Sequence, residues 1–180
     1  MATSRVIVDT FVDIGIETVV GQHRAFLNVD QNFLADPDLL TVPADRIVLQ
    51  LPETTTASVE TMAGIDRLKS IGYEIALNGY RSDLPIAELV DLADVVKLDA
   101  LALDDDRLVR ELATLGDRNL IRVAKRVDSA VRRQRLADMG FHYFQGHFLA
   151  SRLRRAAGSR RASRDAVPNG PRPPNRRALP

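Results

Sequence analysis

Six short apolar runs recur along the first 150 residues, and the stretches between them have the spacing of helices. The runs are rich in β-branched or aromatic residues, which is typical of strands, at 25–29, 46–51, 74–78, 95–99, 119–124 and 141–146. Helical spacing predicts helices over 59–72, 104–116 and 127–140, each followed or ended by a glycine. Apolar strands alternating with helices indicate a parallel sheet covered by helices. This α/β pattern leaves an open doubly wound sheet and a (β/α) barrel as alternatives.

The chain opens with a further helical pattern. Apolar residues at helical spacing precede Gly21, which is a suitable stop: Val6, Ile7, Phe11, Ile14 and Val19. The sequence therefore predicts that the chain begins with a helix and lacks the strand that would precede it.

From Ser151 onward the composition changes to a segment rich in Arg and Pro, in which Asp165 is the only acid. Such a segment has too little apolar surface to offset its ordering entropy, and we expect most of it to be disordered. The chain therefore divides into a domain at 1–150 and a basic tail at 151–180. The tail could bind nucleic acid or an acidic surface through phosphate-type contacts, but it has no aromatic residue for base stacking.

The composition also excludes several classes of protein. The chain has no Cys, which removes disulfides, thiolate metal sites and Cys nucleophiles. No run approaches the roughly 18 apolar residues that a membrane span needs, and the N-terminus has no secretory pattern. We expect a cytoplasmic protein that does not bind membranes.

In parallel α/β folds, functional side chains gather at the carboxyl ends of the strands. The candidate residues at these positions are Asn28, Gln50, Glu53, Asn78, Gly79, Tyr80, Lys97, Asp99, Lys125, Arg126, Asp128, Gln145 and His147. The inner positions among them are mostly amides and amines, whereas Mg²⁺ prefers carboxylate oxygens. Lysines that face a cleft would instead suit a phosphate or carboxylate anion.

Structural interpretations of the same residues stay open. The amides of Asn28, Asn78 and Gln145 could satisfy backbone groups at strand ends. Lys97 could point outward from its strand, and Asp99 could cap the following turn.

The order of these motifs over roughly residues 5 to 150 resembles the EAL domain family, whose members are (β/α) barrels that hydrolyse cyclic di-GMP with Mg²⁺ or Mn²⁺. The divergent branch in which an EAL-like half precedes an HDOD domain is the most similar. AFLNV resembles the strand that ends in an Asn metal ligand, here Asn28. In IVLQLPET, Gln50 stands where a metal-binding Glu belongs and Glu53 matches a later acid. In IALNGY, Asn78 and Gly79 stand where two metal-binding aspartates belong.

The later motifs continue the resemblance. ADVVKLD matches the segment with the active-site lysine, Lys97, followed by Asp99. In RVAKRVDS, Lys125 replaces the active-site Glu, Arg126 replaces a Gly and Asp128 matches a second Glu. GFHYFQGHFLAS resembles the last barrel strand, with Gln145 and Gly146 as the family's Gln-Gly pair.

The resemblance implies a TIM-type barrel with about six of its eight strands, because the Glu-Ala-Leu strand and its predecessor are missing. It also implies that no catalytic set is intact, since Gln50, Asn78, Gly79 and Lys125 replace acids, and that neither a metal nor another cofactor is held. In that case Lys97, Lys125, Arg126 and Gln145 are the expected ligand-binding residues.

We therefore expect a non-catalytic EAL-like signalling module that acts by protein contact or by binding cyclic di-GMP without metal. The open edge of an incomplete barrel favours a protein partner or a homodimer. The alternatives are a residual phosphodiesterase that forms linear pGpG, nucleic-acid binding by the tail, and a gene fragment without independent function. A residual enzyme would need a metal held by Asn28, Glu53, Asp99, Asp128 and Gln145.

Overall fold

The computed structural model describes residues 21, 23–35, 42–146 and 166–167. The helix expected over 6–19 and the disorder expected for the tail both lie outside these residues, apart from 166–167.

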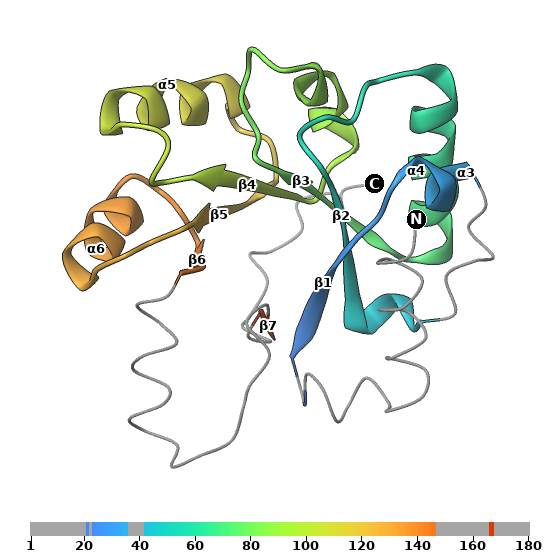
Figure 1. The fold of residues 1–180 in the computed structure, drawn as a ribbon, viewed down its shortest axis with the longest axis horizontal. Coiled ribbons are helices and arrows are strands. Elements are labelled where there is room, and N and C mark those ends of the chain that lie inside the picture. Colours follow the sequence, from blue (N-terminus) through green and yellow to red (C-terminus); the bar gives the residue numbers. More distant parts are fainter. Residues whose placement is uncertain (1–20, 22, 36–41, 147–165, 168–180) are drawn as a thin grey trace, which may run out of the picture.

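Six parallel strands form a half-barrel, as predicted (Figure 1). They pair in chain order, with bounds β1 Arg24–Asn28, β2 Ile47–Leu51, β3 Glu74–Asn78, β4 Val95–Asp99, β5 Ile121–Lys125 and β6 Tyr143–Phe144. The last strand is much shorter than its apolar run. Phe141 donates its backbone N–H to Leu136 at the end of the preceding helix instead of pairing in the sheet.

The connections between the strands are helical. They are α3 Gln31–Ala35, the 3₁₀ helices η2 Ala44–Arg46 and η3 Pro85–Leu92, and the helices α4 Val59–Ile71, α5 Asp105–Leu115 and α6 Ala130–Asp138. The three longer helices begin at Ser58, Asp104 and Ser129, whose side chains each accept an N–H from the first turn. Gly72 ends α4 in the left-handed conformation, as expected for a C-terminal glycine. All three predicted helices are therefore present.

The two faces of the sheet have different roles. One face packs against the helices in a large apolar core, to which α4 contributes Ile65 and Leu68 and α5 contributes Leu108. Figure 1 shows the helices around this outer side of the curved sheet. The inner face has a smaller cluster of Val48, Ala76, Val95 and Val123, against which Phe26, Ile121 and Tyr143 pack. Because side chains alternate between faces, the strand residues two positions beyond this cluster also point inward, at the carboxyl ends.

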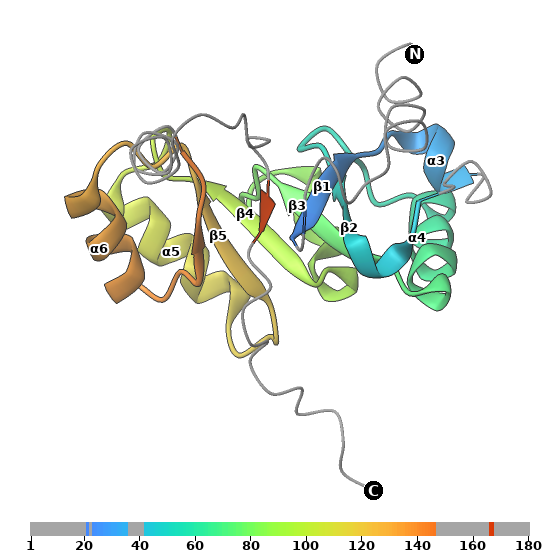
Figure 2. The same ribbon diagram turned by 90° about the horizontal axis from the view of Figure 1, so that it is seen from below.

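The two ends of the sheet differ from each other. The strand β7, Ala166–Val167, pairs antiparallel with β1, with Arg24 opposite Val167 and Ala25 opposite Ala166 (Figure 2). An open gap was expected beside β1, but this edge is paired over two residues. Within the described residues, β6 ends the sheet on the other side. In the same part of the chain, no helix has the length and apolarity needed to cross a membrane.

Candidate functional site

The register of the sheet gathers the predicted strand-end residues on its inner face. Parallel pairing sets them opposite one another in three pairs: Asn28 with Gln50, Asn78 with Lys97, and Asp99 with Lys125. Residues that are opposite in register share a face, so these side chains form one layer at the carboxyl edge.

Lys97 is the most deeply buried of these charged side chains, with 2 % of its surface exposed. Its ammonium donates a hydrogen bond of 2.6 Å to Oε1 of Gln50 and lies 4.0 Å from the centre of the Phe26 ring. The interpretation that Lys97 points outward is therefore wrong. Since an ammonium needs an oxygen acceptor, it fixes the orientation of the Gln50 amide, whose Nε2 then donates to Oδ1 of Asn28 at 2.5 Å.

Lys125 forms the second half of this layer. Its ammonium donates to Oδ1 of Asn78 at 3.2 Å and lies 4.0 Å from Oδ2 of Asp99. Its side chain is 21 % exposed, so it reaches the surface while Lys97 does not. In both halves of the layer a lysine ammonium donates to an amide oxygen. The NH₂ groups of Asn28 and Asn78 therefore remain as donors at the carboxyl edge of the sheet, here called the mouth.

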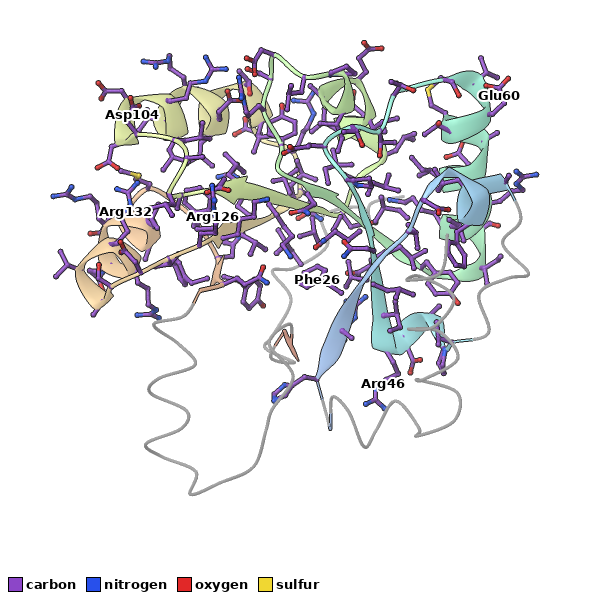
Figure 3. The ribbon with its side chains drawn as sticks, in the orientation of Figure 1. Phe26, Arg46, Glu60, Asp104, Arg126 and Arg132 are labelled. Carbon is purple, nitrogen blue, oxygen red and sulfur yellow. The ribbon has the colours of Figure 1, made fainter. Side chains whose placement is uncertain are left out.

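Arg126 follows β5 and has an unusual backbone. Its φ of 61° is the left-handed value that non-glycine residues adopt rarely, and it is the one non-glycine residue with positive φ in the described part of the chain. Its guanidinium contacts both oxygens of Asp99, with Nε at 2.8 Å from Oδ1 and a terminal nitrogen at 2.5 Å from Oδ2. Phe26 on β1 and Arg126 are labelled in Figure 3.

Asp99 caps the turn that follows β4, as one of the two interpretations predicted. Its carboxylate accepts the backbone N–H groups of Leu101 and Ala102. Burial raises the pKa of Asp99, but the hydrogen bonds from Arg126 and these two backbone groups, with the charge of Arg126, outweigh burial and hold the pKa below its usual value. Asp99 is therefore ionised at neutral pH.

The remaining predicted residues lie around this layer. Gly79 has a φ of 77°, and a Cβ there would meet the carboxylate of Glu53. Gln145 pairs through its backbone with Ala124 and Val127, while Asp128 is exposed. His147 lies outside the described residues.

Sequence reasoning missed two contributors. Phe26, which lies under Lys97, could have been found because it precedes Asn28 by two positions on the same strand face. Glu111 is 1 % exposed and accepts the N–H of Ser82 and Nε of Arg107, both at 2.7 Å, which ties the loop after β3 to α5. Its position on α5 offers no sequence signal for that role.

Metal ligands are few in this arrangement. Among the residues that the structure describes, no three or more His, Asp or Glu side chains are grouped so that they could hold a metal ion.

Comparison with known proteins relates this arrangement to one family. The family model of the EAL domain matches residues 21–152. Cyclic di-GMP phosphodiesterase CdgJ of Vibrio cholerae is 27% identical over 152 residues, which cover 83% of this chain and 35% of that protein. The uncharacterized protein YuxH of Bacillus subtilis is 25% identical over 154 residues, covering 83% of this chain and 38% of that protein. The chain thus spans little more than a third of the length of these relatives.

Solved structures share the fold. The EAL domain of Mycobacterium smegmatis DcpA superposes with a TM-score of 0.63 at 17% identity, over 92% of this chain and 84% of that one. The PaMucR phosphodiesterase in complex with c-di-GMP gives a TM-score of 0.65 at 16% identity, over 83% and 78% of the two chains. With the family match covering most of the described residues, these findings establish that the chain belongs to the EAL domain family.

Proposed function

We propose that this chain is a non-catalytic EAL module that binds cyclic di-GMP without a divalent metal. The observation that carries the proposal is the layer of paired amides and ammonium groups at the strand ends. The amide oxygens of Gln50 and Asn78 each accept a hydrogen bond from a lysine, and that of Asn28 accepts one from Gln50.

These residues do not fit Mg²⁺ or Mn²⁺. Such ions prefer carboxylate oxygens, and an ion on the oxygen of Gln50 or Asn78 would lie beside the ammonium that already occupies it. Hydrolysis by the family that the sequence resembles uses Mg²⁺ or Mn²⁺. Such an ion can lower the activation barrier by several kcal/mol, and about 1.4 kcal/mol of barrier corresponds to a factor of ten in rate. We therefore expect no metal-dependent turnover by this chain.

The same chemistry favours an anionic ligand. Lys125 and Arg126 present positive charge at the mouth, and amide NH₂ groups are hydrogen-bond donors. Two structural neighbours, PaMucR and the FimX EAL domain of Pseudomonas aeruginosa, are described in complex with c-di-GMP. The other predicted ligand residues have supporting roles in this proposal, in which Lys97 orients the Gln50 amide and Gln145 extends the layer to β6.

The test measures turnover and binding separately. Purified protein is incubated with cyclic di-GMP and Mg²⁺ or Mn²⁺, and linear pGpG is followed by chromatography. Binding is measured by calorimetry in EDTA and again with Mg²⁺. We expect binding in EDTA and no pGpG. Turnover that is lost in Asn28→Ala would overturn the proposal in favour of the residual phosphodiesterase, and heat that requires Mg²⁺ would contradict metal-free binding.

Lys125→Glu is an informative companion variant. The new carboxylate would lie near Asn78 and Asp99 and would turn a cationic mouth into an anionic one. We expect weaker dinucleotide binding in EDTA and stronger Mg²⁺ binding. Arg118→Glu serves as the matched control, because it makes the same change of charge at a residue that pairs with Asp91 of η3, at the amino end of the sheet.

A second candidate function is protein contact through the edge of the sheet at β6. β6 has two residues and ends the sheet within the described part of the chain, and unpaired strand edges invite pairing with a second chain. We propose a homodimer or a protein partner at this edge. Sedimentation of the full chain tests the homodimer, which predicts a concentration-dependent dimer that Tyr143→Pro weakens. A stable monomer at all concentrations would contradict it.

A further inference from the structure

Three charged groups converge at the mouth although two of them are consecutive in the chain. Neighbouring residues on a strand normally point to opposite faces, so Lys125 and Arg126 would be separated by the sheet. The left-handed φ of Arg126 breaks this alternation. Both side chains consequently reach the same carboxylate, that of Asp99, with the ammonium at 4.0 Å and the guanidinium at 2.5 Å.

The three groups differ from Lys97 in access to solvent. The Arg126 side chain is 53 % exposed and Lys125 is partly exposed, so an incoming anion can approach both cations. Lys97 is buried against Phe26 and Gln50. The set of Lys125, Arg126 and Asp99, here called the mouth triad, has a formal charge of +1.

The carboxylate of Asp99 is held in place beside the two cations. It accepts hydrogen bonds from the backbone N–H groups of Leu101 and Ala102 as well as from Arg126. The low pKa of Asp99 keeps it ionised at neutral pH. An anion bound to the two cations must therefore tolerate a fixed negative charge beside it.

We infer that Asp99 is a specificity-determining residue of the mouth triad: beside the two cations, its fixed charge reduces the advantage that they would give a dianionic phosphomonoester over a monoanionic phosphodiester. A phosphodiester carries one negative charge, whereas a phosphomonoester carries nearly two above its second pKa of about 6. Coulomb repulsion scales with ligand charge, so Asp99 opposes a monoester about twice as strongly as a diester. This inference rests on the proposed function for the identity of the diester ligand.

The test compares the wild type with Asp99→Asn by calorimetry in EDTA at about pH 8, where a monoester is a dianion. The ligands are cyclic di-GMP, which has two phosphodiesters of one negative charge each and presents one of them to the mouth triad, and GMP, whose phosphomonoester carries two charges on one group. With a separation of about 6 Å and the dielectric constant of water, removing one negative charge should tighten cyclic di-GMP about threefold and GMP about tenfold. The asparagine keeps an oxygen for the backbone N–H groups of Leu101 and Ala102.

A second variant and a control keep the outcome interpretable. Lys125→Met lowers the charge of the mouth triad to zero and should weaken the binding of both ligands, with the larger factor for GMP because its phosphate carries the larger charge. Asp91→Asn removes the same charge from an Arg–Asp pair, Arg118 with Asp91, at the opposite end of the sheet, and should change neither affinity.

The outcomes separate the inference from the proposed function. If cyclic di-GMP binds the wild type but Asp99→Asn changes the two affinities equally, or weakens both, the inference is overturned while the proposed function stands. If only GMP binds, the proposed function fails, and the effects of Asp99→Asn and Lys125→Met on GMP still decide whether Asp99 opposes dianions. If neither ligand binds, both are overturned.

Discussion

The left-handed backbone of Arg126 can be tested by comparing two variants, Arg126→Gly and Arg126→Ala. We expect the glycine variant to be the more stable of the two. The φ of 61° at Arg126 costs an L-residue roughly 1–2 kcal/mol, a cost that glycine does not have. Alanine restricts the unfolded chain more than glycine does, which favours alanine by about 0.4–1 kcal/mol. The difference leaves Arg126→Gly about 0.5–1 kcal/mol more stable than Arg126→Ala, the reverse of the usual order.

The comparison of the two variants cancels the loss of the side chain. Both lose the contact with Asp99, which contributes at most about 1 kcal/mol because the guanidinium is half exposed. Urea unfolding followed by circular dichroism measures the free energy of unfolding of each variant. If Arg126→Ala equals or exceeds Arg126→Gly in stability, the left-handed backbone does not hold in solution, and the convergence of Lys125 and Arg126 on one carboxylate fails with it.

Three further changes test other parts of the structure. Glu111→Ala should lower the free energy of unfolding by about 2 kcal/mol in urea melts, because a buried charged acceptor is lost, whereas a change below about 0.5 kcal/mol would contradict that role. Gly146→Ala should cost about 3 kcal/mol in the same assay, since a Cβ would overlap the backbone of Val127, and unchanged stability would show that β6 is not held there. Burial, with the charge of Arg122, lowers the pKa of His142, whose Nδ1 accepts the backbone N–H of Arg122. The unfolded state therefore binds the proton first as the pH falls below about 6.5, so stability should decrease from there toward the folded pKa, and His142→Asn should remove that part of the slope in melts at about pH 7.5 and 5.5.

Strands and helices could be predicted because the fold repeats two simple periodicities. Continuous apolar runs located all six parallel strands, and helical spacing with a final glycine located α4, α5 and α6. Errors occurred at the ends, where backbone groups have competing partners. Leu120 donates its N–H to Arg118 in a turn, so β5 begins at Ile121, two residues after the start of the predicted run at 119–124. The helix η3 was missed because its eight residues, of which Pro85 is the first, adopt a 3₁₀ conformation and are too few for a long amphipathic repeat.

The composition of the site was predictable, but its connections were not. Position at a strand end identified Asn28, Gln50, Asn78 and Lys125, and the register of a parallel sheet brings them into one layer. Sequence could not decide which way Lys97 points, because valines precede it on both faces. The backbone conformation of Arg126 could not be predicted either, since no sequence pattern indicates a positive φ at an arginine.

The pairing of Lys97 with Gln50 limits what a single mutation at this site can do. An acid introduced at position 50 alone would form an internal salt bridge with the adjacent ammonium and would not be available to an external cation. An acid at position 79 would adopt an unfavourable backbone conformation and would crowd Glu53. Under the proposed function, building a metal centre at these strand ends would therefore require several coordinated substitutions, because each acid introduced alone is neutralised by a lysine or disfavoured by the backbone.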